Sequence, residues 1–564
     1  MKTPDGVPAR AESHAIALPQ VNVNVYQLAL VTVLVAAFLT RFIRLGTPPE
    51  FYFDETYFPR TAQEIYRGDP RSWEFYGHEN THPPLSKLFM AGGMAVFEVG
   101  DSIFPALVPG SGGVDNPYAW RFFGALAGVG AVLFMYLLAR KLFNSEIAGL
   151  AGAFLMTFEG LAFAQSRIAT PDTYVLCFML GSLYFLVSER FLFSGVFFGA
   201  AVACKWIAAL AGIPIVLFLG WLLITRLREA RPTGEVKWFE IVLPVGLGVL
   251  YAGITLFIYK YLGTHPDTTF SITQGIVEIC AVILIIGGAL SALAGLLGLI
   301  AERSATGSVV LSPQGKLCLE VALVFGVFFM LVPGFVYFMT YWPFLLNPPS
   351  TQAMGEADWH GLGQVIRQNR LAFDFHSSLD QPHPYSSTWD EWPITARPVF
   401  LYSTSGNAKI YSLGNPVIFW TGLAALAFAL WQALAFVRAR ISASGMLSVQ
   451  GRLPPHRVAL LFVVLGYLAL WLPMAPTSRV LFIYHYLPAL SFAILALAYA
   501  VHWLWHQPEE WGRYAAITYL AIVALTFAFL YPHLAAVPVP GWLDELYYPF
   551  DGTHRLHNPL FDWQ

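Results

Sequence analysis

Charged side chains are scarce in this chain. Asp, Glu, Lys and Arg make up 12 % of its 564 residues, against 56 % hydrophobic residues. A soluble chain of this length would form several domains with charged surfaces, so the composition argues against a soluble protein. The net charge is −3 and no run of Lys and Arg is present, so we expect no nucleic-acid partner.

Cysteines are few, and we expect no cleavable leader. The four cysteines lie in or beside apolar runs: Cys177, Cys204, Cys280 and Cys318. This placement predicts neither a disulfide framework nor a cysteine-based metal site. The first 24 residues are mostly polar and lack the order of basic, apolar and small residues that signal peptides have. The first apolar segment should therefore stay as an anchor.

Long apolar runs are what the chain has in quantity. Most span roughly 18–25 residues, long enough to cross a hydrocarbon core of about 30 Å. They must be helical, because lipid offers the backbone no hydrogen-bond partner. We count about 13, near 25–43, 119–141, 147–165, 172–189, 191–204, 207–226, 238–260, 273–300, 317–341, 415–437, 457–474, 480–503 and 512–532. The sequence predicts an all-α polytopic membrane protein.

Lys and Arg are distributed unevenly between the short loops. One set of loops, which includes Arg140 and Arg226, is rich in them, and the opposite set is poor. The rich side is expected to be cytoplasmic. The N-terminus is then inside, and the C-terminus and all long loops are extracytoplasmic. Because loops on a rigid scaffold carry function, we expect the active face to be the outer one.

This order divides the chain into five parts. They are a cytoplasmic tail (1–24), an N-terminal transmembrane catalytic module that includes the outer loop 44–118 (25–341), an extracytoplasmic loop (342–414), a C-terminal four-helix transmembrane module (415–532) and an extracytoplasmic tail (533–564).

Two adjacent carboxylates, Asp54 and Glu55, follow the first apolar segment within an aromatic stretch, 51–58. Neighbours in an extended segment point opposite ways, so one of the two should face a reaction. An acid at the membrane boundary suggests a catalytic base that takes a proton from an acceptor hydroxyl. The alternative is a solvated loop pair.

Residues 78–82 spell His-Glu-Asn-Thr-His, the HExxH pattern of zinc proteases. That site needs both histidines on one face of a helix. Pro83 disfavours helical geometry at His82, so we expect no zinc site. The turn should instead present His82 to a polar ligand, and residues 85–99 should form a helix at the membrane interface.

The segment 159–172 joins the third and fourth predicted spans. Glu159 lies inside an apolar run, where an ionisable group is costly and is a functional candidate. Arg167 and Asp172 lie at the outer boundary. Two interpretations stay open: contact with the substrate, or an Arg–acid pair that locks two helices.

Three cations also lie at the outer boundary, against the charge rule: Arg121, Lys205 and Arg479. A lipid phosphate would explain them, since guanidinium groups bind phosphate bidentately. The alternatives are snorkelling to headgroups for Arg121 and Lys205, and an interfacial anchor for Arg479 with its neighbour His485. In the loop 342–414, His383 and Tyr385 suit sugar or peptide contact, or an ordered cap over the helices.

Together these motifs resemble the protein O-mannosyltransferase family, in the GT-C class of lipid-dependent glycosyltransferases. The resemblance covers residues 25 to 505 in family order. It is carried by Phe53–Glu55, His82–Lys87, Arg121, Gln165–Arg167 with Asp172, Lys205–Trp206, His383–Ser387, Trp392–Pro393, Arg397–Pro398, Leu413–Pro416 and Tyr484–Tyr486.

The resemblance implies a GT-C fold with about 11–13 transmembrane helices in a cell membrane. It implies a polyprenyl- or dolichyl-phosphate mannose donor and inverting transfer to Ser or Thr of exported protein. It implies Asp54 as the base, with Glu55 beside it, and Arg121 as a donor-phosphate contact. We expect Lys205 and Arg479 to bind the donor phosphate together with Arg121. Substrate-binding residues would be His82, Lys87, Glu159, Arg167, Asp172, His383, Tyr385 and His485.

The resemblance requires no cofactor, and a divalent metal stays open. The chain departs from the family pattern at Glu159, where Asp is expected, and by an extra hairpin near 238–300. Two other functions are weighed. One is a transferase that moves another sugar, such as aminoarabinose, to a lipid acceptor. The other is a polytopic transporter, which predicts charged or broken helices at mid-bilayer and internal repeats. We find no repeat of fixed period.

Overall fold

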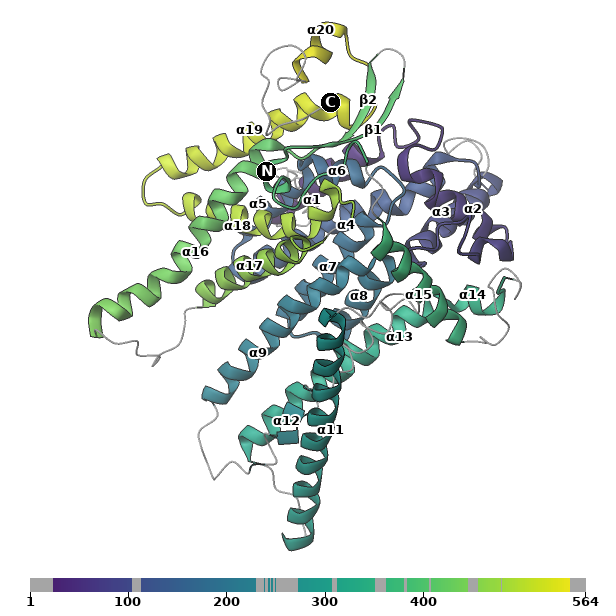
Figure 1. Ribbon diagram of the computed structural model, residues 1–564. Helices are drawn as coiled ribbons and strands as arrows, with labels where there is room; N and C mark the ends of the chain where they lie inside the picture. Colours follow the sequence, from purple (N-terminus) through teal and green to yellow (C-terminus); the bar gives the residue numbers. More distant parts are fainter. Residues whose placement is uncertain are drawn as a thin grey trace, which may run out of the picture.

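A computed structural model describes residues 24–103, 113–229, 272–306, 312–349, 362–379, 383–404, 407–444, 455–477 and 479–547, with a few positions between 238 and 249. Nine helical stretches within these ranges are long and apolar enough to cross a membrane, and three shorter ones are also apolar. The predicted all-α polytopic architecture is therefore confirmed (Figure 1).

The N-terminal module, residues 25–341, contributes most of the helices. Its long or apolar helices are α1 (Val25–Phe42), α4 (Pro117–Phe143), α5 (Glu146–Thr157), α7 (Asp172–Val187), α8 (Phe191–Cys204), α9 (Gly212–Glu229), α11 (Ile272–Thr306), α12 (Pro313–Gly326) and α13 (Val332–Met339). Between them lie α2 (Phe58–Tyr66), α3 (Leu85–Ile103) and α6 (Gly160–Gln165).

The second half adds four membrane helices: α16 (Pro416–Ser444), α17 (Pro455–Trp471), α18 (Leu487–Trp505) and α19 (Trp511–Leu534). The connecting segments carry α14 (Trp342–Leu346), α15 (Leu362–Ser378) and α20 (Gly541–Asp544). They also carry an antiparallel hairpin of β1 (Val399–Thr404) and β2 (Ala408–Ser412). An entirely helical prediction missed this hairpin.

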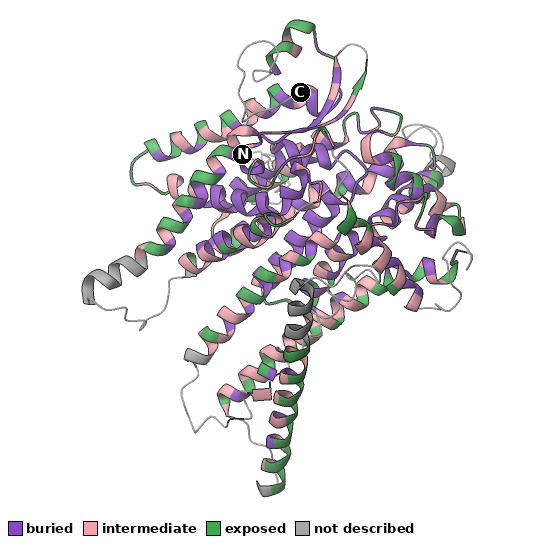
Figure 2. Ribbon diagram, viewed as in Figure 1, coloured by how far each residue is buried: buried purple, intermediate pink, exposed green. Residues whose placement is uncertain are grey.

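The core is shared between the two helical modules. Buried side chains of α4, α7 and α18 belong to one cluster, in which Met135 and Leu180 join Leu490 and Ile494. Figure 2 shows the buried residues at the centre and mostly exposed or intermediate residues on α11 and α12. Apolar side chains that stay exposed on α11 and α12 are suited to contact with lipid.

One predicted span differs from the structure, and another is not tested by it. The run 147–165 is not one helix: it is α5 and α6, interrupted at Phe158 and Glu159. The Glu159 carboxylate accepts hydrogen bonds from the first backbone N–H groups of α6, which a continuous helix would not leave free. The predicted span 238–260 falls almost wholly outside the described residues.

The segment after α1 contains the predicted helix that begins directly after two prolines. This helix, α3, starts at Leu85 and packs against α2, α4 and α8. A side chain at Gly93 would collide with the carbonyl of Ala119, so glycine allows α3 to lie directly on α4. That α3 lies at the membrane interface stays a prediction.

Candidate active site

Asp54 and Glu55 lie on a short 3₁₀ turn, η1 (Phe53–Thr56), rather than on the extended segment we expected. The turn separates the two carboxylates. Glu55 is fully buried, whereas Asp54 is half-buried. Among the described residues, no group donates a hydrogen bond to the Asp54 side chain. The structure thus leaves one acid of the pair open to a ligand.

Arg121, on α4, holds the other acid. Its Nε and Nη2 donate to the two Glu55 carboxylate oxygens at 2.7 and 2.6 Å. Its Nη1 donates to the carbonyls of Leu45 and Pro48, and Nη2 also reaches the carbonyl of Glu50. A guanidinium has five N–H donors, and all five are used. Arg121 is therefore buried against Glu55 with no donor left for a phosphate.

Glu159 and Arg167 are also occupied by structural contacts. Arg167 donates to four backbone carbonyls at and after the end of α1, those of Thr40, Arg41, Ile43 and Arg44. Glu159 caps α6 and accepts from the backbone N–H of Asn415 at 3.1 Å. The open alternative of an Arg–acid pair is not formed between these two residues. They join helices through backbone groups, and neither lines a cavity described below.

Lys205 and Asp172 form a buried ion pair near Asp54. Lys205 follows α8, and its Nζ lies 2.9 and 3.1 Å from the two carboxylate oxygens of Asp172, the first residue of α7. The same Nζ lies 5.1 Å from the centre of the Tyr484 ring. Lys205 is thus held between the end of α8 and the start of α7, and it also lines the cavity described below.

The pKa of Asp54 is raised to about 7. Burial is the largest cause, because it disfavours the charged carboxylate. The charges of Asp172 and Glu79 raise this pKa further, and Lys205 opposes them. An acid with a pKa near neutrality is suited to take and release a proton at physiological pH.

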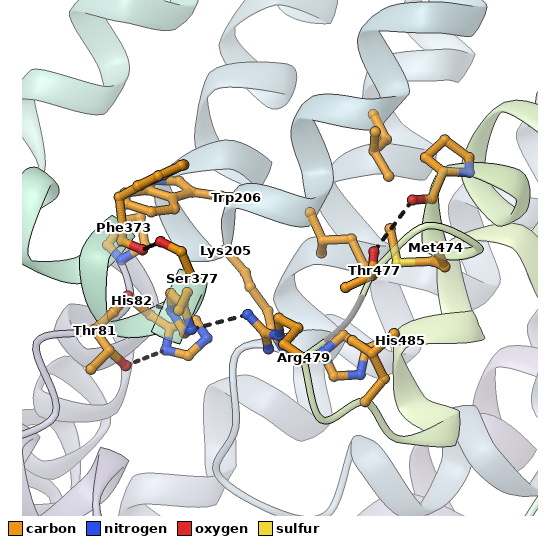
Figure 3. Close-up of a pocket in the computed structure, with 16 residues that line it drawn as sticks. Thr81, His82, Lys205, Trp206, Phe373, Ser377, Met474, Thr477, Arg479 and His485 are labelled. Carbon is orange, nitrogen blue, oxygen red and sulfur yellow. Dashed lines mark hydrogen bonds between the residues drawn. The ribbon is translucent and has the colours of Figure 1, made fainter. Parts of the chain in front are cut away.

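A cavity of about 400 Å³ opens between the two helical modules. It is lined by Thr81, His82, Pro83, Lys205, Trp206, Ile207, Leu210, Phe373, His376, Ser377, Pro473, Met474, Thr477, Arg479, Leu481 and His485. In Figure 3, Arg479 lies between His82 on one side and His485 on the other, with the Lys205 side chain running toward it. The structure thus brings together four predicted residues, His82, Lys205, Arg479 and His485, from three separate segments of the chain.

Arg479 differs from Arg121 in its surroundings. Within the described part of the chain its one hydrogen-bond partner is His376, at 3.0 Å from Nη1. Its Nε is buried and has no partner. Burial also lowers the pKa of Arg479. A half-buried guanidinium with unused donors beside a cavity is what an anionic ligand would require.

His82 is oriented by a buried network. Its Nδ1 lies 2.9 Å from the Glu79 carboxylate, which also accepts from Lys87 Nζ at 3.0 Å. Lys87 is fully buried in this network, outside the cavity. The other ring nitrogen of His82, Nε2, has no partner in the described chain. Residues 78–82 are not helical, so the geometry that an HExxH zinc site needs is not formed.

His383 and Tyr385 lie on another side of η1. The His383 ring is 6.4 Å from the ring of Phe53 and 5.0 Å from that of Phe482, and Tyr385 packs on Phe400. All of them are partly exposed. They form an aromatic surface next to Asp54 that does not line the cavity.

Sequence reasoning missed His376, Glu79 and Trp206 as site residues. His376 belongs to the predicted loop 342–414, which we expected to be a cap or a contact surface. Nothing in the sequence pattern distinguishes it from the other histidine of that loop with a predicted role, His383. Glu79 was read only as part of the protease-like pattern. Its position three residues before His82 was a usable signal, because a carboxylate often orients a neighbouring imidazole.

A second, largely apolar cavity of about 1050 Å³ lies between α8, α9, α13 and the π-helical turn at Val327–Leu331. Trp206 lines both cavities. Its indole N–H donates to Tyr337, and Tyr337 donates to Asn369 of α15. The polar cavity and the apolar one therefore share a wall.

The fold and the site define a polytopic membrane enzyme of the GT-C type. Two family models match the chain: dolichyl-phosphate-mannose-protein mannosyltransferase over residues 31–262, and the C-terminal four-transmembrane region of protein-O-mannosyltransferase over 362–542. The chain belongs to the protein O-mannosyltransferase family.

Individual bacterial relatives match this chain along almost its whole length. The polyprenol-phosphate-mannose–protein mannosyltransferase of Mycobacterium tuberculosis is 24 % identical over 92 % of this chain and 90 % of its own. That of Corynebacterium glutamicum is 21 % identical over 93 % and 92 %. In structure, the chain resembles a protein in the Saccharomyces cerevisiae Pmt1–Pmt2 complex bound to the sugar donor, with a TM-score of 0.66, 14 % identity, and 96 % and 93 % coverage. This last likeness supports the fold.

Proposed function

We propose that this protein is an inverting glycosyltransferase. It transfers a mannosyl group, or another hexosyl group, from a polyprenyl-phosphate sugar to Ser and Thr hydroxyls of exported protein. One observation carries the proposal: Asp54, a carboxylate to which no described group donates a hydrogen bond, lies near the cation Lys205, and Lys205 lines one cavity together with Arg479. The named activity of the bacterial relatives supports the choice of donor and acceptor.

Asp54 is the proposed base. It takes the proton from the acceptor hydroxyl as the oxygen attacks the anomeric carbon, and the phosphate leaves from the opposite face. The configuration of the sugar is therefore inverted. A single base is enough, because a sugar phosphate has a good leaving group once its charge is stabilised, unlike the glycosides that need a matched acid. Glu55 acts indirectly by holding η1 on Arg121.

Arg479 and Lys205 stabilise the departing phosphate. The leaving group gains negative charge as the bond to the sugar breaks, so fixed cations lower the barrier more than they stabilise bound donor. Arg479 has N–H donors without a partner in the described chain. Lys205 pairs with Asp172 and also lines the cavity. This role replaces the one we expected for Arg121. The two cations supply the charge stabilisation, so the proposal needs no metal ion.

The apolar cavity suits the prenyl chain of the donor. It adjoins the phosphate-binding residues through Trp206, so one molecule can place its phosphate in the polar cavity and its first isoprene units in the apolar one. His82 and His485 then face the sugar. The aromatic surface of His383, Tyr385 and Phe53 lies beside Asp54 and suits the acceptor peptide.

The orientation in the membrane is part of the proposal. The Lys- and Arg-rich short loops support a cytoplasmic N-terminus, with the C-terminus and the active site extracytoplasmic in the cell membrane. We keep the division into a catalytic module (25–341), an outer loop (342–414), a four-helix module (415–532) and terminal segments. The cavity contains residues of the first three of these parts.

The direct test uses purified protein in nanodiscs with polyprenyl-phosphate mannose and a Ser/Thr peptide. We expect mannosyl-peptide with inverted anomeric configuration, detected by mass spectrometry and NMR. Polyprenyl-phosphate glucose and aminoarabinose serve as donor controls, and a lipid acceptor replaces the peptide in a parallel reaction. Transfer only to lipid, or only from aminoarabinose, would replace the proposal with the lipid-acceptor alternative. Absence of transfer from any donor would reject enzymatic function.

A further inference from the structure

Arg479 is the least supported of the site's cations. It lies on the non-helical segment between the turn Leu472–Met474 and the turn Ile483–Tyr486, so no helix fixes its backbone. A long side chain on such a segment loses considerable rotamer entropy when it is held in one geometry. A fixed partner that reduces this loss before the donor binds would favour binding and transfer.

His376, on α15, is that partner, and each of its two ring nitrogens has a hydrogen bond. Its Nε2 lies 2.9 Å from the carbonyl oxygen of Thr81, which can only accept, so Nε2 carries the proton. Its Nδ1 is then a lone pair, and it accepts from Arg479 Nη1 at 3.0 Å. The hydrogen-bond partners thus fix one neutral tautomer, and burial supports it by lowering the pKa of His376 to about 3.

The His376 ring is also fixed by its neighbours. It packs edge-on against the rings of His82 at 4.8 Å and Trp206 at 6.2 Å between ring centres. The imidazole is therefore held between the outer turn that contains Thr81 and the wall shared by the two cavities. Side chains locked by packing and by a second hydrogen bond are suited to orient a functional group.

A neutral acceptor has an advantage over a carboxylate at this position. A carboxylate would pair with Arg479 and cancel the charge that the phosphate needs, as Glu55 does for Arg121. A neutral imidazole accepts one N–H bond and leaves the full positive charge on the guanidinium. Within the described part of the chain, no group accepts from the remaining donors of Arg479, so they stay available to a ligand.

We propose that His376 is a positioning residue, which orients the Arg479 guanidinium toward the donor phosphate from the outer helix α15. This inference rests on the proposed function, because it gives Arg479 the phosphate as ligand. It predicts that the hydrogen bond from Arg479 to His376 Nδ1, rather than the bond from His376 to Thr81, determines kcat/KM for the sugar donor.

The matched variants His376→Asn and His376→Gln separate the two bonds. The amide oxygen of Asn can occupy the position of Nδ1, whereas Gln places its amide near Nε2. We expect His376→Asn to keep kcat/KM for polyprenyl-phosphate mannose within about threefold of wild type, and His376→Gln and His376→Ala to lower it at least about tenfold. KM for the peptide acceptor should not change in any of them.

Arg479→Ala and the double variant with His376→Ala complete the test. If His376 acts through Arg479, the double variant loses no more donor kcat/KM than Arg479→Ala alone, because coupled residues are non-additive. Ser378→Ala, on the same helix and outside the cavity, should match wild type, and thermal unfolding of all variants reports folding. Additive losses, or equal donor kcat/KM for the Asn and Gln variants, would overturn the inference. Wild-type transfer would still support the proposed function in that case.

Discussion

Two groups of charged residues flank η1 and differ in how fully they are satisfied. In the first, the buried lock, Arg121 uses five donors and Glu55 uses both oxygens, and every partner is protein. In the second, which pairs Asp54 with the cations that line the cavity, Asp54 has no hydrogen-bond partner among the described residues, and Arg479 has one. Neighbours in sequence, Asp54 and Glu55, thus belong to different groups.

The difference teaches how to assign roles to cations at a membrane boundary. Residue type and position placed Arg121 and Arg479 in one class, since the sequence predicts both on the outer side in an apolar setting. Their hydrogen bonds separate them. A saturated buried guanidinium stabilises the fold, whereas one with unused buried donors beside a cavity is available to a ligand.

The largest effect should come from Asp54→Asn, which keeps the size of the side chain and removes the base. We expect kcat to fall by about 10²–10⁴-fold, the usual contribution of a positioned general base. The temperature of unfolding should stay unchanged or rise, because a neutral amide replaces a carboxylate whose charge burial disfavours. Single-turnover transfer with saturating donor measures the effect. Near-normal turnover would remove Asp54 from the mechanism.

Breaking the buried lock should act on stability first. Arg121→Met leaves Glu55 buried without its cation, which costs about 3–5 kcal/mol in comparable cases. Denaturant or thermal unfolding in detergent should show this loss, whereas Arg479→Ala should unfold close to wild type. The double variant Arg121→Met with Glu55→Leu should recover much of the stability. An Arg121→Met protein of normal stability that has lost donor affinity would reverse the comparison.

The smallest effect is a shift of the pH profile. Asp54 must be ionised to accept a proton, and its pKa is raised to about 7, so kcat/KM should fall about tenfold per pH unit below that value. Asp172→Asn removes a negative charge that raises this pKa and frees Lys205, which lowers it. The acidic limb should therefore move to lower pH. An unchanged limb would show that another group titrates.

The membrane helices could be predicted from the apolar runs, because a single segment in lipid satisfies its backbone hydrogen bonds only as a helix. The break at Glu159 could not, because the run is apolar on both sides and the carboxylate also accepts from the backbone N–H of Asn415, more than 250 residues away. The β1–β2 hairpin was missed for a similar reason. Its strands are short, and they are stabilised by contacts with α19 and α6 that sequence periodicity does not reveal.

The site was partly predictable. Aromatic walls and a boundary position indicated Asp54, and a charge on the wrong side of the membrane indicated Lys205 and Arg479. The pairing of Arg121 with Glu55 was beyond sequence reasoning, because it joins residues 66 positions apart through a geometry set by η1. His376 was hidden for the same reason, since its role depends on a partner 103 residues away.

Arg167 ties the end of the first membrane helix to the loop before α7. Its guanidinium donates to four carbonyls at and after the end of α1, and it lies 5.5 Å from the centre of the Phe163 ring. Membranes differ in thickness, and spanning helices respond by tilting or shifting. With α1 fastened in this way, we expect the depth of Asp54 to depend on protein contacts, and we expect α11 and α12, which keep many apolar side chains exposed, to adjust first to a thinner or thicker bilayer.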